Sequence, residues 1–313
     1  MIDLRRLQVL RAVHHHGMVT SAAAALHLTP SAVSQQIRQL SRDVGVPLLE
    51  PHGRRVRLTV AAHVLLDHAD ALYDRWEAAK AELAAHVEGA AGPLRLCGFP
   101  SGVVGLLAPA AARLAKTQPD LSVSVTEAEA ADCFDRLLTD QADLAVVIPT
   151  PDSPAADDPR FDQTPLVDEA QDLLVPAGHP LATREAVRLA EAAGDPWITP
   201  EPGTCDQHHV VVSACIAAGF TPHVAHRATE WPAVSALVAH GLGVALIPRL
   251  AALPAEHTVV RVPLHGNPTP TRRILTCIRR GARRHPVIAA GLDALAEIAA
   301  MEPGVIEVRP GRR

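Results

Sequence analysis

The chain contains no apolar run near the ~18 to 20 residues that a membrane-spanning helix needs. Its first residues, MIDLRRLQVLRAV, lack the apolar core and cleavage site of a secretion signal. Aromatic residues make up only 3% of the chain, so its cores must be built mainly from Leu, Val and Ala. Five scattered cysteines, never spaced as CxxC, argue against a disulfide framework or a structural zinc site: Cys97, Cys133, Cys205, Cys215 and Cys277. We therefore expect a cytoplasmic protein without metal or cofactor, and 313 residues suffice for two or three domains.

Positive charge is concentrated at the start of the chain. Residues 1–60 hold eight arginines and three acidic residues, whereas the whole chain has a net charge of −5. A basic segment joined to an acidic body indicates that residues 1–60 meet a polyanion and that the remainder does not.

The stretch LHLTPSAVSQQIRQL, at 26–40, has the pattern of a DNA-reading helix. Pro30 is tolerated at the first position of a helix, so the proline begins this helix rather than breaking it. Val33, Ile37 and Leu40 form one apolar stripe, which we expect to pack on helices before 17 and at about 20–26. The opposite stripe carries short polar groups and one arginine, residue types that read base edges. Our predicted DNA contacts in this unit are Thr20, Thr29, Pro30, Ser31, Ser34, Gln35 and Arg38.

A hairpin is predicted to follow this helix as a wing. Its strands are expected at 46–50 and 56–59, around a turn at Pro51, His52 and Gly53. Arg54, Arg55 and Arg57 on it are suited to phosphate contact.

Three adjacent histidines, 14–16, cannot converge on one metal ion from a helix, and we expect a solvated helix end near phosphate.

A long helix and an α/β body make up the rest of the chain. Residues 59–87 lack Gly and Pro and carry an apolar seam that includes Leu72, Trp76 and Leu83, which predicts pairing with a second copy before a hinge at 89–93. Beyond the hinge, the pattern predicts strands that alternate with helices. The strands are expected at 94–99, 121–129, 142–148, 172–176, 196–200, 223–229, 243–248, 258–264 and 271–278. The helices are expected at 105–116, 131–140, 183–193, 208–218, 232–240 and 286–301.

These motifs resemble the LysR-type transcriptional regulators over almost the whole chain. AAAALHLTPSAVSQQIRQL resembles the family's AAxxLxxSxxAVSxxIxxLE, VPLLEPHGRRVRLT its xxLFxRxxRxxxLT, and HGLGVALIP its GxGIALLP. The resemblance implies an α/β protein with a winged helix-turn-helix at 1–59, a dimerising linker helix and hinge at 60–92, and a two-lobed effector domain, like a solute-binding protein, at 93–302. Lobe 1 would span about 93–163 and 265–302, lobe 2 about 164–264, and 303–313 would be a flexible tail. Pro51 stands where the family has arginine, a change that removes a contact of the wing with the DNA backbone.

The resemblance also implies double-stranded operator DNA and a small-molecule effector as partners, with a homodimer or homotetramer and no membrane. Ligands bind at the carboxyl ends of strands in open α/β sheets, and helix starts there suit an anionic effector. The alternative is a set of loops with local capping hydroxyls. The predicted effector-binding residues are Pro100, Ser101, Gly102, Pro149, Thr150, Thr199, Thr204, Glu230 and Trp231.

Three alternatives remain beside this interpretation. The segment with Cys205 and Cys215 resembles in outline the region where peroxide-sensing members of the family keep a redox pair, although the spacing here is ten residues. The alternative is a coincidence, with Cys215 on a buried helix face. A solute-binding protein is expected to carry a secretion signal, and an enzyme is expected to carry a set of catalytic residues. No Ser-His-Asp or phosphate-loop spacing stands out in the sequence. We therefore expect no enzymatic activity. The basic cluster IRRGARRHP at 278–286 is expected to be a solvated loop, with a subunit contact as the second interpretation.

Overall fold

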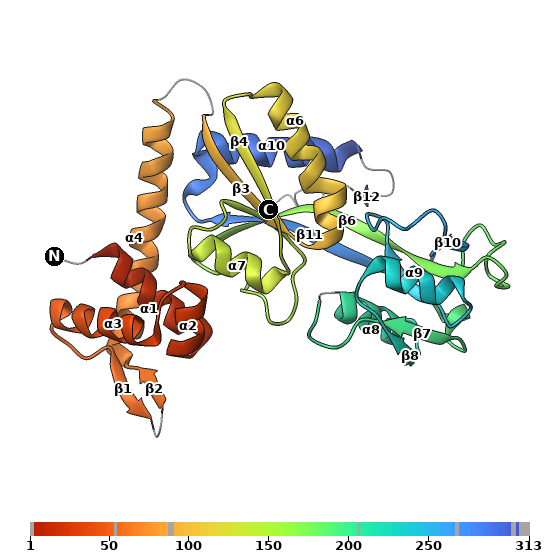
Figure 1. Cartoon of the computed structure of the whole chain (residues 1–313), viewed down its shortest axis with the longest axis horizontal. Helices are drawn as coiled ribbons and strands as arrows, with labels where there is room; N and C mark the ends of the chain where they lie inside the picture. Colours follow the sequence, from red (N-terminus) through yellow and green to blue (C-terminus); the bar gives the residue numbers. More distant parts are fainter. Residues whose placement is uncertain are drawn as a thin grey trace.

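The structure is a computed structural model of the chain and describes residues 3–52, 55–86, 91–205, 207–266, 269–301 and 305–306. Figure 1 shows the N-terminal helices and hairpin at one end of the molecule, and strands β7 and β8 with helix α9 at the other. Among the described residues, no helix has the length and apolar character needed to cross a membrane.

The N-terminal unit is a three-helix cluster with a hairpin. It comprises α1 (Leu4–His16), α2 (Val19–Ala25), α3 (Pro30–Val44), β1 (Leu49–His52) and β2 (Arg55–Leu58). α1 ends at Gly17 in the left-handed conformation (φ 67°), as glycine readily does. Leu7, Leu10, Val33, Ile37 and Leu40 are fully buried together, so the predicted apolar stripes meet in one core.

The helix α4 (Val60–Ala84) follows and has two apolar faces. Ala62 and Ala69 on one face are fully buried in the core of the N-terminal unit. Leu72, Trp76 and Leu83 on another face are 49%, 47% and 64% exposed. The predicted apolar seam therefore has two parts. One part packs against the N-terminal unit of the same chain, and the other is exposed to solvent.

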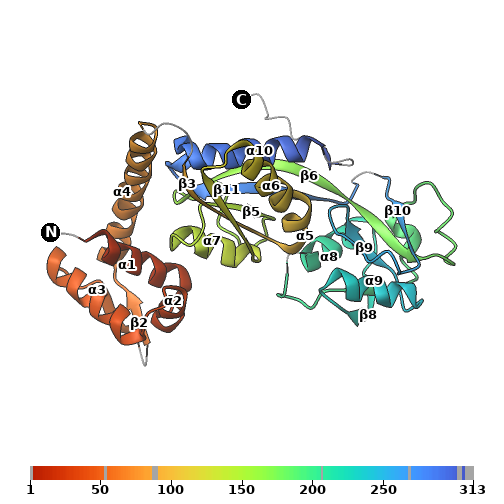
Figure 2. The same cartoon turned by 45° about the horizontal axis from the view of Figure 1, so that its top comes forward.

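The first lobe, lobe 1, is a sheet covered by helices on both faces (Figure 2). Cys97 and Ala145 face α7, while their neighbours Leu96 and Leu144 face α6 and α10, as the two-residue period of strands requires. Strands β3, β4 and β5 are parallel, and β11 runs antiparallel to β5 and β6. Lobe 1 comprises β3 (Gly92–Gly98), α5 (Pro100–Gly102), the π-helical turn η1 (Val103–Leu107), α6 (Ala108–Thr117), β4 (Leu121–Glu127), α7 (Ala130–Leu138), β5 (Leu144–Val147), the first half of β6 (Phe161–Pro176), β11 (Thr271–Arg279), the short helix η3 (Ala282–Arg284) and α10 (Pro286–Met301).

The second lobe, lobe 2, is built on the far half of the same strand β6. That half pairs with both β9 and β10, so one 16-residue strand belongs to both lobes. Trp197 is fully buried on one face of this lobe, and α9 packs on the other. Lobe 2 adds the short helix η2 (Leu189–Ala192), β7 (Pro196–Thr199), α8 (Gln207–Ala217), β8 (His223–Arg227), α9 (Trp231–Ala239), β9 (Ala245–Pro248) and β10 (Val259–Pro263).

Three expectations differ from this arrangement. The strand predicted at 46–50 lies at Leu49–His52, so Pro51 and His52, expected in the turn, instead pair with Val56 and Arg55. The helix predicted at 183–193 is wrong except for the turn η2, because Val187 forms a bridge with Leu264 and donates its N–H to Pro263 (3.0 Å). Within the tail expected at 303–313, β12 (Val305–Ile306) pairs with β6, while the remainder of that segment lies outside the described residues.

Candidate DNA-binding surface and ligand cleft

The start of α3 is fixed by local hydrogen bonds. Thr29 adopts an extended backbone as N-cap, and its hydroxyl accepts a hydrogen bond from the N–H of Ala32 (3.2 Å). Its oxygen also lies 2.9 Å from the Ser31 hydroxyl. Pro30 occupies the first helical position, as expected.

The polar stripe of α3 faces solvent. Ser31, Gln35 and Arg38 are exposed and Ser34 is half-buried, while Thr20 lies exposed on α2. Among the described residues, the side chains of Gln35 and Arg38 take part in no hydrogen bond or ion pair. The helix backbone is therefore held by the core while these side chains remain available to a ligand.

The wing holds fewer uncommitted charges than the sequence indicates. β1 and β2 pair antiparallel, with Leu49 opposite Leu58. Arg57 Nε lies 2.5 Å from Glu50 Oε1, so its charge is partly neutralised within the hairpin. Arg54 and the side chain of Arg55 lie outside the described residues.

Between the lobes, Ser101 is held by a buried ion pair. Arg272 Nη2 donates to Ser101 Oγ (2.7 Å), and Arg272 Nε lies 2.5 Å from Glu169 Oε2. Glu169 is fully buried and also accepts the N–H of Leu250 (2.6 Å). The guanidinium stacks over Phe99 at 4.9 Å from the ring centroid. The cleft therefore has a rigid floor whose charges balance each other.

A cavity of about 50 Å³ opens on this floor. Gln207 at the start of α8 is 4% exposed, and its Nε2 donates to Gln171 Oε1 (3.0 Å) and to the Leu246 carbonyl (3.1 Å). Its Oε1 is buried without a hydrogen-bond donor among the described residues. A ligand with an O–H or N–H group would supply that donor.

The structure brings some of the predicted effector residues together. Pro100, Ser101, Glu230 and Trp231 line this cavity. Thr150 and Thr204 line an adjoining cavity of about 250 Å³.

Other predicted effector residues do not line either cavity. Thr199 is fully buried and its hydroxyl donates to the Pro200 carbonyl (3.3 Å). Gly102 packs beneath the Phe99 ring, where an added Cβ would lie 2.8 Å from Cζ. Pro149 is exposed beyond β5 and belongs to neither cavity.

The sequence interpretation missed Glu129, Gln207 and Arg272, which also line the cleft. Arg272 could have been found, because it shares the buried face of β11 with Ile274 and Thr276. An arginine on a buried strand face needs a buried partner. Gln207 carries no such local signal.

Cys205 lines both cavities, whereas Cys215 does not. Burial raises the pKa of the Cys205 thiol above its ordinary value. Cys215 lies on α8, packed in the lobe 2 core, and burial raises its pKa to about 12. Both side chains are therefore thiols rather than thiolates at neutral pH.

Comparison with known proteins identifies the class of this fold. The family described as "LysR substrate binding domain" matches residues 88–300, and "Bacterial regulatory helix-turn-helix protein, lysR family" matches residues 4–63. The chain therefore belongs to the LysR family and is a DNA-binding transcriptional regulator. Regulators of this family bind DNA and small-molecule effectors and act as oligomers.

Individual relatives include regulators named OxyR and AlsR. The chain is 30% identical over 283 residues to the "DNA-binding transcriptional dual regulator OxyR" of Escherichia coli, covering 90% of each chain. It is 29% identical to the regulator AlsR of Bacillus subtilis, covering 80% of this chain and 82% of that one. Among solved structures, full-length OxyR from Pseudomonas aeruginosa matches with a TM-score of 0.66, 20% identity and 99% of each chain covered. A hydrogen-peroxide-bound OxyR variant from Corynebacterium glutamicum matches with a TM-score of 0.61 and 22% identity, over 95% of this chain and 92% of that one.

Proposed function

We propose that this regulator recognises its operator through the polar stripe of α3. The uncommitted, exposed side chains of Gln35 and Arg38 carry the proposal, since glutamine can pair bidentately with adenine and arginine with guanine. The wing would hold the DNA backbone and position the helix. Arg57 would contribute less to this than its charge indicates, because Glu50 competes for it.

Binding to the DNA upstream of the protein's own coding region, followed by fluorescence anisotropy, tests this assignment. Arg38→Ala is expected to cost ~1 to 3 kcal/mol at one preferred base position. Arg113→Ala, which removes an exposed arginine from α6, serves as the matched control and should leave binding unchanged. Equal affinity and base preference in the wild type and in Arg38→Ala would contradict the assignment.

We further propose that α4 forms a homodimer through its exposed stripe. Leu72, Trp76 and Leu83 are separated by four and seven residues, which is coiled-coil spacing, and all three are about half exposed or more. Trp76→Glu is expected to give monomers in analytical ultracentrifugation, whereas Arg75→Glu at the neighbouring exposed position should not. A Trp76→Glu variant that still dimerises would refute this interface, and a wild-type tetramer would add a second one.

For the cleft, we propose a small neutral polar effector rather than the anion expected from the sequence. Glu169 neutralises Arg272, and the lining includes two more carboxylates, Glu129 and Glu230. A cavity of about 50 Å³ holds only a few non-hydrogen atoms. Thermal-shift screening of small polar compounds should find a ligand whose effect is lost in Ser101→Ala and kept in Ser122→Ala, an exposed serine of β4. A hit insensitive to Ser101→Ala would place the effector elsewhere.

Hydrogen peroxide is the second candidate signal, favoured by the size of this cavity and by Cys205 in its wall. Several relatives are named hydrogen peroxide-inducible genes activators. Attack of the Cys205 sulfur on peroxide would give a sulfenic acid and release water. A subsequent disulfide with Cys215 would release a second water and would require α8 to unwind. The eight helical steps from 207 to 215 span about 12 Å, beyond the ~7 Å Cα–Cα limit of a disulfide.

Thiol titration before and after peroxide tests this candidate. Loss of one thiol in the wild type and none in Cys205→Ser is expected if Cys205 is the sensor. Loss of a second thiol, abolished by Cys215→Ser, would demonstrate the disulfide. No loss of thiols from the native protein would end the redox hypothesis.

A further inference from the structure

The basic cluster at 278–286 packs against α4 rather than forming the solvated loop expected from the sequence. Gly281 has a left-handed backbone (φ +85°), and an added Cβ would lie 2.4 Å from the Asp74 carbonyl on α4. His15 and His16, expected near phosphate, instead lie 2.7 Å and 3.5 Å from Asp135 of α7. The N-terminal unit and α4 are therefore docked on lobe 1.

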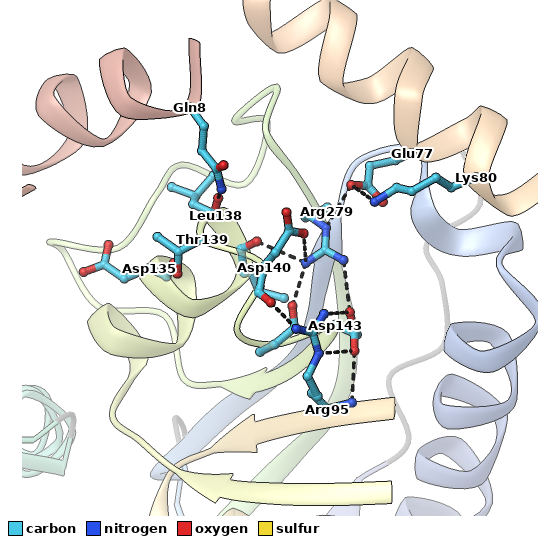
Figure 3. Close-up of polar contacts among 12 residues, drawn as sticks. Gln8, Glu77, Lys80, Arg95, Asp135, Leu138, Thr139, Asp140, Asp143 and Arg279 are labelled. Carbon is cyan, nitrogen blue, oxygen red and sulfur yellow. Dashed lines mark hydrogen bonds and ion pairs between the residues drawn. The ribbon is translucent and has the colours of Figure 1, made fainter. Parts of the chain in front are cut away.

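Arg279 at the end of β11 connects α4 to lobe 1 (Figure 3). Its Nε donates to Glu77 Oε1 on α4 (3.1 Å), and its Nη1 donates to the carbonyls of Leu137 (3.1 Å) and Ala142 (2.6 Å). Its Nη2 donates to Asp143 Oδ1 (3.1 Å). Every nitrogen of this guanidinium is thereby committed to protein acceptors.

Asp143 is committed as well. Arg95 donates to it from its backbone N–H (3.0 Å), its Nε (2.9 Å) and its Nη2 (2.7 Å). Burial alone would raise the pKa of Asp143, but these hydrogen bonds and the charges of both arginines lower it below its usual value. The carboxylate therefore stays ionised and has little capacity for another cation.

Lys80 of α4 has no carboxylate oxygen to itself. Its Nζ lies 2.7 Å from Glu77 Oε1, the same oxygen that accepts from Arg279. Two buried carboxylates, Glu77 and Asp143, thus serve three cations. The third acid nearby, Asp140, is 55% exposed and lies 3.5 Å from Arg279. Because Asp140 also lines the junction, three carboxylates there balance three cations. The 34% exposed Lys80 shares its carboxylate oxygen with Arg279, so that its ammonium group retains N–H donors without an acceptor among the described residues.

A cavity of about 340 Å³ lies at this junction, whereas the cavity on the floor of the lobe cleft measures about 50 Å³. Its polar side is formed by the charged residues just described, and its other wall is apolar, with Ala84, Pro93, Pro286, Val287 and Ile288. This volume falls within the range of small-molecule sites.

Residues with unused hydrogen-bond donors are among those that line this cavity. Val287 and Ile288 begin α10, and no oxygen among the described residues accepts their backbone N–H groups. His285 Nδ1 is buried without a partner in the same part of the chain. Burial lowers the pKa of His285, so its ring is neutral at pH 7 and can donate one hydrogen bond.

We propose that this cavity binds a small organic monocarboxylate with a short apolar body. The carboxylate would meet Lys80 and the start of α10, where anions are favoured, and the apolar body would lie against Ala84 and Pro93. The site is separate from the lobe cleft and from the DNA-binding surface. Because α4 and lobe 1 both line it, an occupant would bias their docking and thereby the placement of the N-terminal unit.

The chain has only two lysines, Lys80 and Lys116, which makes the site directly observable. Reductive methylation with ¹³C-formaldehyde keeps both charges and labels the two lysines and the terminal amine for NMR. The probes are butyrate, hexanoate and benzoate, titrated into the full-length protein to about 10 mM, above a millimolar dissociation constant. Lys80→Gln and Lys116→Gln assign the signals.

The expected result is a saturable shift of the Lys80 signal with at least one probe and none of the Lys116 signal. Ala84→Phe, which fills the cavity, should weaken the apparent affinity at least ten-fold, and the exposed neighbour Ala85→Phe should not. The proposal is overturned if no probe saturates, if both lysines shift together as ionic strength rises, or if Ala84→Phe binds as well as the wild type. These outcomes leave the proposed roles of α3 and of the lobe cleft unaffected.

Discussion

The buried pair Arg272 and Glu169 allows a sharp test of the energetics of the lobe cleft. Arg272→Met would leave the fully buried Glu169 carboxylate with only the N–H of Leu250 as a donor. Removing one partner of a buried ion pair costs about 3 to 5 kcal/mol. The Ser101 hydroxyl would also lose its donor, which adds about 1 kcal/mol.

The double variant Glu169→Gln/Arg272→Met should be much less damaging. The glutamine would still accept the Leu250 N–H, while no unpaired charge would remain buried. We expect a total cost of about 1 to 2 kcal/mol, although Glu169→Gln alone should cost about 3 to 5 kcal/mol because it strands the arginine. The two substitutions are thus coupled by several kcal/mol.

Urea unfolding of the wild type, the two single variants and the double variant measures this coupling. Tryptophan emission follows it, since Trp197 is fully buried in lobe 2. Comparable denaturant slopes for the four proteins would show that the midpoints report stability. If the double variant loses as much stability as the two single variants combined, Glu169 and Arg272 do not behave as a coupled buried ion pair.

Three further predictions concern other parts of the chain. Thr29→Ala removes the N-cap of α3 and should cost about 1 kcal/mol, measured by thermal unfolding, together with weaker operator binding. Gly243→Ala should destabilise by at least about 2 kcal/mol, since its φ is +152° and a Cβ would lie 2.4 Å from the Pro196 carbonyl; unchanged stability would contradict that geometry. Arg95 helps to lower the pKa of Asp143 in the folded protein. The stabilisation by this carboxylate should therefore be complete above its pKa in the unfolded chain, about 3.9, and should be lost as pH falls through its pKa in the folded protein. Asp143→Asn should therefore be less stable at pH 7 and show a shallower acid dependence in unfolding measured at several pH values.

Local patterns in the sequence were sufficient for the N-terminal unit. Pro30 at the first turn, the stripe Val33, Ile37 and Leu40, and Gly17 as helix end are all decided within one or two turns of chain. The same holds for α10, predicted at 286–301 and observed at Pro286–Met301. The two-residue period likewise located most strands of both lobes.

Pairings between distant residues were beyond local patterns. The segment at 183–193 has helical composition, yet Val187 is held by residues more than seventy positions away. The cleft shows the same limit, since Ser101 was predicted but its partner Arg272 lies 171 residues further along the chain. Likewise, the charges at 278–286 could not be paired with α4 before the fold was known.

The strand β6, which belongs to both lobes, also determines how the lobes can move. Its register with β11 shifts between Ile274 and Leu275, opposite Val167 and Pro165, which marks a bulge. A bulge bends a strand and increases its local twist. It lies two residues from Glu169, which holds the floor of the cleft through Arg272. A signal that loosens this ion pair would thus act beside a bend in a strand that both lobes share, so that closing the cleft becomes a change in the curvature of one continuous sheet.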